Sequence, residues 1–99
     1  MNIKIQSIKF DADKKLVDFI NKKVSKIEKF FDNIVKVEVY LRLENTQELE
    51  NKVVEIRIDV PGSGLFAERK AKSFEEAVDG CIDAIKAQIQ RHKDRLRGN

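Results

Sequence analysis

The chain has 99 residues, of which 41% are hydrophobic and 37% are charged, and its formal net charge is +3 at pH 7. This length suits a single domain, which we place at residues 1–99, and such a chain should bury roughly 65% of its unfolded surface around one core. Because the net charge is small, any attraction to a polyanion must come from local clusters of basic residues.

Membrane insertion and disulfide bonding are not expected from this sequence. No apolar run approaches the roughly 20 residues of a membrane span, and the first residues lack the apolar centre of a signal peptide. We therefore expect a cytoplasmic protein with no membrane partner. The single cysteine, Cys81, lies on an apolar stripe, so it is expected to fill the core rather than act as a nucleophile or ligand.

The first half of the chain predicts a strand, a helix and a second strand. Residues 2–8 alternate between apolar and polar side chains, as a short strand does. Asp11 or Asp13 can cap a helix over residues 13–31, whose apolar residues recur at helical spacing. Residues 34–44 alternate throughout, which predicts a half-buried strand with the odd-numbered residues from Val35 to Leu43 directed inward.

The second half predicts a hairpin followed by a long helix. Residues 45–51 form a polar connection, and strands are predicted at 52–60 and 65–72. Residues 61–64, Pro-Gly-Ser-Gly, are read as a hairpin turn because the spacing of a phosphate-binding loop and its following helix are missing. Ser73 and Glu76 form a capping box that opens a helix over residues 73–97.

The order β-α-β-β-β-α predicts an α+β fold. An apolar face on each helix and on one side of the sheet indicates a two-layer sandwich, in which two helices cover one face of a four-stranded sheet. This arrangement is similar to that of double-stranded RNA-binding domains. The opposite sheet face carries charges of both signs, so we expect ion pairs between neighbouring strands there.

Basic residues gather on both predicted helices. On the first helix a lysine row falls within about 60° at 100° per residue; it comprises Lys15, Lys22, Lys26 and Lys29, with Lys23 nearer the apolar stripe. On the last helix an acidic first half precedes Lys86, Arg91, Lys93, Arg95 and Arg97. Solvated helix surfaces explain these charges. Two helices on one sheet could instead merge them into one surface that binds the backbone of double-stranded RNA.

Catalytic chemistry has little support in the sequence. The one histidine, His92, and the one cysteine lie eleven residues apart, so they form neither an i, i+4 pair nor a zinc site. We expect no enzymatic activity, metal, cofactor or small-molecule substrate, and a packed or RNA-facing role for His92. The enzymatic alternative is a phosphohydrolase of acylphosphatase type, but that fold ends on a strand and binds phosphate in a loop that is acidic here, at residues 10–13.

Two segments carry a resemblance to a known family. They are KIEKFFD (residues 26–32), preceded by Lys23, and AVDGCIDAIKAQIQRHKDRLR (residues 77–97). With these helices and the element order, nearly the whole chain resembles the ribosome hibernation promoting factor family, also called ribosome-associated inhibitor or sigma-modulation proteins.

The resemblance implies a bacterial stress-response protein that regulates translation. It implies binding to the small ribosomal subunit and its rRNA, in the channel for mRNA and tRNA, which silences translation and promotes ribosome hibernation in stationary phase or starvation. The basic contacts that it implies are Lys23, Lys26, Arg91, His92, Lys93 and Arg95. The charge pattern adds Lys22, Lys29, Lys86 and Arg97.

Three departures from the family pattern accompany the resemblance. Glu75 stands where an aromatic Tyr is frequent, and Ala84 and Ala87 stand where basic residues are common. The chain ends at Asn99, so it resembles the short, tail-less members, and whether ribosomes are paired is left open. The oligomeric state of the free protein is also open, with a monomer as one alternative.

A second function from another class is an interaction module that modulates a transcription factor. Its surface would be the acidic half of the last helix together with the polar connection at residues 45–51. The acidic residues in question are Glu75, Glu76, Asp79 and Asp83.

Overall fold

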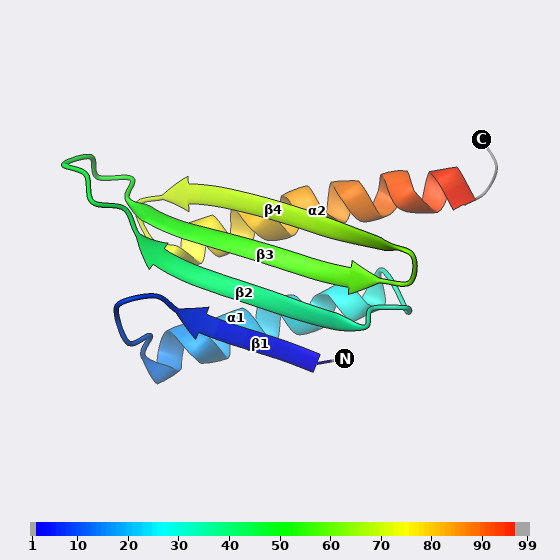
Figure 1. The fold of residues 1–99 in the computed structure, drawn as a ribbon, viewed down its shortest axis with the longest axis horizontal. Helices are drawn as coiled ribbons and strands as arrows, with labels where there is room; N and C mark the ends of the chain where they lie inside the picture. Colours follow the sequence, from blue (N-terminus) through cyan, green and yellow to red (C-terminus); the bar gives the residue numbers. More distant parts are fainter. Residues whose placement is uncertain (1, 97–99) are drawn as a thin grey trace.

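The computed structural model describes residues 2–96. Its elements are β1 (Asn2–Ser7), α1 (Lys14–Ser25), η1 (Lys26–Lys29), β2 (Lys36–Leu43), β3 (Lys52–Val60), β4 (Ser63–Ala71) and α2 (Phe74–Leu96). The strands form one sheet in the order β1-β2-β3-β4, with β1 parallel to β2 and the remaining pairs antiparallel. Both helices lie on one face of this sheet (Figure 1), so the predicted two-layer α+β fold is confirmed.

The core lies between the sheet and the helices. Alternate residues of the strands, such as Val39 on β2 and Ile56 on β3, are fully buried beneath the helices. Ile20 on α1 and Ile85 on α2 meet them from the other layer and are also fully buried. Burying an aliphatic side chain of this size stabilises the fold by roughly 1.5–3 kcal/mol. The period-2 pattern of the strands and the helical period of the helices therefore account for the packing.

Cys81 fills the core, as predicted from the sequence. Its side chain is fully buried, and its Sγ lies 3.3 Å from the carbonyl oxygen of Val54. Burial raises the pKa of the Cys81 thiol to about 11. Since the thiolate is the reactive form, we expect Cys81 to react with a thiol reagent at pH 8 far more slowly in the folded protein than in denaturant. Equal rates in both conditions, measured by mass spectrometry, would contradict this burial.

The first helix is shorter than predicted. Asp13 provides its cap, with the Leu16 N–H donating to Asp13 Oδ1 at 2.8 Å. The predicted helix over 13–31 ends as α1 at Ser25, because the chain tightens into the 3-10 helix η1 at Lys26–Lys29. A 3-10 helix has three residues per turn, so Lys29 lies almost directly above Lys26 instead of 60° away from it.

The second strand is also shorter than predicted. β2 spans Lys36–Leu43 rather than 34–44. The alternation also predicts more buried residues than the structure has. Val37, Val39 and Leu41 are fully buried, but Val35 is 59% exposed and Leu43 is 50% exposed. These two residues lie before the strand and at its last position, where the helices do not cover them. Alternation indicates which side a residue faces but not how far the opposing layer extends.

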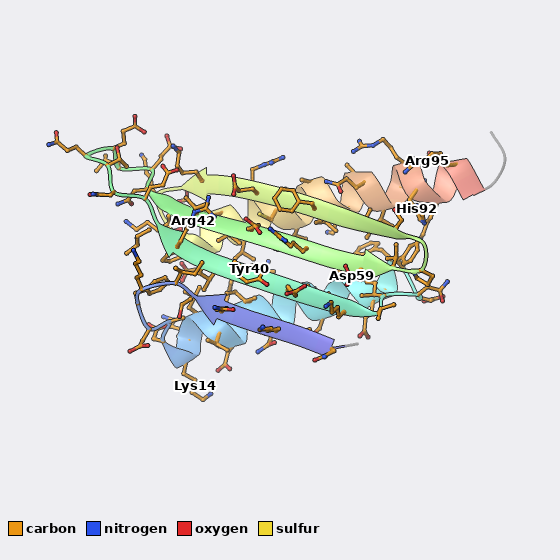
Figure 2. The ribbon with its side chains drawn as sticks, in the orientation of Figure 1. Lys14, Tyr40, Arg42, Asp59, His92 and Arg95 are labelled. Atoms are coloured by element: carbon orange, nitrogen blue, oxygen red, sulfur yellow. The ribbon has the colours of Figure 1, made fainter. Side chains whose placement is uncertain are left out.

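The uncovered sheet face carries the ion pairs that its mixed charges predict (Figure 2). Arg42 lies 2.9 Å from Glu68 and 3.7 Å from Glu55, both on other strands. Val53 belongs to this face, between Arg42 and Lys70 in the strand register, yet it is only 2% exposed. The aliphatic stems of such long side chains cover apolar neighbours while their charged ends stay in water. This burial of Val53 was not expected from the alternation of β3.

The hairpin and the start of α2 form as predicted. Val60 pairs with Ser63, so the turn narrows to Pro61 and Gly62, and β4 begins two residues earlier than predicted. Gly62 has φ 75°, a left-handed conformation that glycine adopts without a steric penalty. At the next connection the Glu76 N–H donates to Ser73 Oγ at 3.1 Å, as in the predicted capping box. Within residues 2–96 neither helix has the length and apolar character that crossing a membrane requires.

Candidate nucleic-acid interface

The two helices run side by side in the same direction. Figure 1 shows α1 and α2 both starting at the end of the sheet where β1 stops, and α2 continuing past the β3–β4 turn. The helices contact each other along this seam. Because they are parallel, the basic end of α2 lies beyond the end of η1, and the lysines of α1 and η1 face the middle of α2. The topology therefore places Lys86 of α2 opposite Lys23 and Lys26 across the seam, with Arg91 and Arg95 farther along α2.

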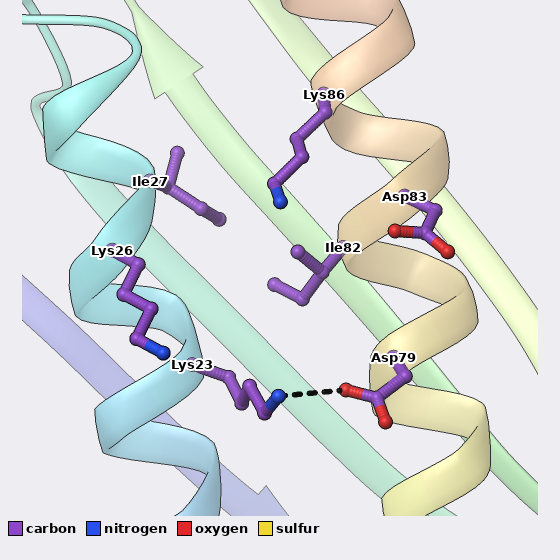
Figure 3. A pocket seen from close by; sticks show the side chains of 7 residues that line it. All are labelled: Lys23, Lys26, Ile27, Asp79, Ile82, Asp83 and Lys86. Atoms are coloured by element: carbon purple, nitrogen blue, oxygen red, sulfur yellow. Dashed lines mark ion pairs between the residues drawn. The ribbon is translucent and has the colours of Figure 1, made fainter.

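A groove lies in the seam between the helices. It encloses about 360 Å³ and is lined by Lys23, Lys26, Ile27, Asp79, Ile82, Asp83 and Lys86. Figure 3 shows Lys23 of α1 and Ile82 and Lys86 of α2 turned toward this space. Lys23 Nζ lies 3.4 Å from Asp79 Oδ1, which closes one end of the groove with an ion pair. Exposed partners of this kind contribute at most about 1 kcal/mol, so an incoming anion could displace the aspartate.

Lys26 and Lys86 give the groove its available positive charge. Both side chains are exposed, and neither has an ion pair within residues 2–96. The Lys86 ammonium lies 4.9 Å from the centre of the Phe30 ring, an aromatic residue that is 40% exposed. This cation–π contact holds Lys86 over the seam without neutralising its charge. Two lysine ammonium groups on facing helices are suited to contact the phosphates of a nucleic-acid backbone.

A second hollow lies at the basic end of α2. It is lined by Arg91, Asp94 and Arg95. Gln90 Nε2 donates to Asp94 Oδ1 at 3.2 Å, so the one carboxylate of this segment already accepts a hydrogen bond. Arg91 and Arg95 lie one turn apart and are both exposed. Guanidinium groups in such an arrangement can each donate two hydrogen bonds to one phosphate.

His92 packs against the segment that joins η1 to β2. Its ring lies 5.4 Å from the ring of Phe31, tilted by 56°, and the residue is half-buried. Phe31 is itself 8% exposed and belongs to the core. Of the two roles predicted for His92, the structure shows the packed one. A tilted aromatic pair of this kind adds about 0.5–1.5 kcal/mol to the area it buries.

The structure brings only some of the predicted residues together. Lys23, Lys26 and Lys86 share the groove, and Arg91 and Arg95 share the second hollow. Lys22 and Lys29 are exposed but line neither space, Lys93 is half-buried, and Arg97 lies outside the described residues.

Sequence reasoning missed the acidic part of the groove. Asp79 and Asp83 line it together with the lysines, whereas the sequence assigns them to a separate acidic surface. The sequence offered one indication: Asp79 and Asp83 lie three residues before and one residue after the apolar Ile82. Side chains at these positions border the buried face of a helix. Parallel packing of the helices was needed to place Lys23 opposite Asp79.

The sequence of residues 3–97 matches the model of the family described as Sigma 54 modulation protein / S30EA ribosomal protein. This protein belongs to that family. Its curated relatives include the ribosome hibernation promoting factor of Klebsiella oxytoca, 32% identical over 81% of this chain and 80% of the relative. The factor of the same name from Escherichia coli K12 is 27% identical over 98% of each chain. The family predicted from the sequence is thus confirmed.

Solved structures agree with the S30EA fold of the chain. A ribosomal subunit interface protein from Coxiella burnetii superposes with a TM-score of 0.85, at 20% identity, over 95% of this chain and 99% of that one. The N-terminal domain of Protein Y from Thermus thermophilus gives a TM-score of 0.79, at 24% identity, over 93% of this chain and 99% of that one. At these identities the structures support the fold.

Proposed function

We propose that this protein binds the small ribosomal subunit and its rRNA through the groove and the basic end of α2. Bound there, it would block the channel for mRNA and tRNA, silence translation and promote ribosome hibernation in stationary phase or starvation. The observation that carries the proposal is the pair of exposed ammonium groups of Lys26 and Lys86 on facing walls of the groove, with Arg91 and Arg95 exposed farther along α2. Family membership and the names of the curated relatives support it.

Phosphate contacts would supply the affinity and the shape of the helix layer would select the site. Basic side chains that contact phosphates do not distinguish base sequences, and structured RNA is recognised mostly through its backbone and groove geometry. The molecule measures 47 × 24 × 18 Å. Its longest dimension runs along the two helices (Figure 1). An elongated domain with exposed basic side chains on its helix layer can act as a steric plug, which requires occupancy of the channel and no chemical step.

A cell-free translation assay tests this function. Adding the protein should inhibit synthesis from a reporter mRNA, and saturating mRNA and initiator tRNA added beforehand should delay the inhibition because they occupy the same channel. The matched control is the variant with Lys26, Lys86 and Arg91 changed to glutamate. Undiminished translation at protein concentrations well above those of ribosomes would refute the proposal.

A further inference from the structure

β4 is an edge strand of the sheet. It spans nine residues and pairs with β3 on one side only. The backbone N–H and C=O groups on the other side of such a strand form a template on which another strand can pair. Proteins usually shorten, charge or cover these edges. Whether another strand can pair with β4 therefore depends on what bonds the backbone N–H and C=O groups that point away from β3.

Gln88 of α2 occupies the outward groups of Phe66. The Phe66 N–H donates to Gln88 Oε1 at 3.1 Å, and Gln88 Nε2 donates to the Phe66 carbonyl oxygen at 2.6 Å. Two residues opposite each other in an antiparallel ladder exchange the same pair of bonds. The carboxamide of Gln88 thus takes the place of a neighbouring strand. Gln88 is half-buried, as expected for a side chain held in this position.

Arg69 closes the next outward carbonyl group. Its Nη1 donates to the carbonyl oxygen of Glu68 at 2.7 Å. Its stem crosses Gly80 of α2, where a Cβ atom would lie 3.1 Å from Arg69 Cγ. Glycine at this position lets the arginine pass between helix and strand. Two side chains, from α2 and from β4 itself, therefore close this edge of the sheet.

We propose that Gln88 locks the β4 edge and that its removal opens a strand-pairing surface for β4 of a second copy of this chain. Glu68 and Lys70 project from the same face of β4. An antiparallel β4–β4 pair can place each Glu68 opposite the Lys70 of the other copy, with favourable charge pairing, and it then sets Phe66 opposite Lys72. This pairing requires the exposed Arg69 side chain to leave the Glu68 carbonyl oxygen, and it adds to the ion pairs that Glu68 and Lys70 form with Arg42 and Glu44. Such a contact is two-fold symmetric and closes as a dimer. The proposal does not depend on ribosome binding.

The test compares Gln88→Ala with Gln90→Ala, which makes the same change on the exposed side of α2. We expect hydrogen exchange at the Phe66 amide to accelerate about tenfold in Gln88→Ala under dilute, monomeric conditions, because the Phe66 N–H loses the Gln88 oxygen that accepts its hydrogen bond. At high concentration the same variant should form dimers in analytical ultracentrifugation. The wild type and Gln90→Ala should show neither change. Should the alanine variant fail to fold, Gln88→Leu replaces it with the same expected results, because leucine keeps the apolar stem and removes both the acceptor and the donor.

A second substitution shows whether the dimer uses the β4 edge. Phe66→Pro in the Gln88→Ala background removes the N–H that a second β4 strand would bond, so the monomer should return. Proline is tolerated at this position because the Phe66 N–H points away from β3. Phe66→Ala in the same background removes the ring but keeps the N–H, so the dimer should persist. The proposal is overturned if Gln88→Ala stays monomeric at every concentration, or if its dimer survives Phe66→Pro.

Discussion

Changing Lys26, Lys86 and Arg91 to glutamate should weaken binding to small ribosomal subunits by about 10³-fold or more. Each side chain is exposed and lines the groove or the second hollow. A hydrogen bond to a charged group is worth roughly 1.5–3 kcal/mol, so three lost phosphate contacts already amount to about three powers of ten. Repulsion between the new carboxylates and the phosphates adds to the loss. Fluorescence anisotropy with labelled protein measures the affinity.

The choice of these three residues follows from the structure. Lys23 pairs with Asp79 across the helix seam, so its reversal would place two carboxylates together and disturb the helix packing. Lys93 is half-buried, which makes its reversal a risk to folding. Lys23 and Lys93 are therefore left unchanged in the variant. Lys26 and Arg91 carry no such penalty, and Lys86 loses only its contact with the exposed Phe30 ring, so the circular dichroism spectrum should stay unchanged.

A matched control separates the local site from net charge. Lys4, Lys9 and Lys72 are exposed and lie away from the groove, and their reversal lowers the formal charge by the same amount, from +3 by 3 × 2 to −3. The residues next to Lys9 and Lys72 lie at the end of the sheet opposite the C-terminal end of α2 (Figure 1). This control should bind within a few-fold of the wild type. Equal losses in both variants would assign the binding to overall charge.

Binding should also depend steeply on salt. If about 6–10 phosphates are contacted, affinity should fall by roughly 10³–10⁵ between 50 and 200 mM salt, because each contact releases condensed counterions. The described groove and hollow supply four exposed cations, Lys26, Lys86, Arg91 and Arg95. Neighbouring basic residues would have to supply the remaining contacts. Titrations at constant magnesium give the slope of log affinity against log salt.

The triple variant sharpens the salt measurement. Each phosphate contact contributes about 0.9 to the slope in a duplex and about 0.7 in a single strand, so loss of three contacts should reduce the slope by roughly 2–3. The Lys4, Lys9 and Lys72 control should keep the slope of the wild type. Affinity that does not change with salt would rule out phosphate contacts as the source of binding, whatever the effect of the substitutions.

Most of the fold follows from residue periodicity. The strand over residues 52–60 was predicted with its observed bounds, since apolar and polar residues alternate from Val54 to Val60. Asp13 and Ser73 form hydrogen bonds at the starts of the two helices that their short polar side chains predict. The 3-10 helix at Lys26–Lys29 was missed because Ile27 and Phe31 keep helical spacing through it. Periodicity does not register this change in hydrogen bonding.

The site could be predicted only in part, because contacts across elements depend on packing. Sequence spacing groups lysines on one helix, but it cannot show that Lys86 lies over Phe30 or that Asp79 faces Lys23. The role of Gln88 has no sequence signal at all, since an isolated glutamine in a polar stretch of a helix usually faces water. Its two bonds to Phe66 follow from the position of α2 beside β4.

Co-sedimentation with separated ribosomal subunits tests the proposed function most directly. The protein is layered with small or large subunits on sucrose gradients at near-physiological salt, and each fraction is probed for the chain. We predict that it travels with small subunits, that the triple variant remains at the top, and that the lysine control travels like the wild type. Protein that remains at the top of every gradient would contradict ribosome binding and would direct attention to a protein partner of the acidic half of α2.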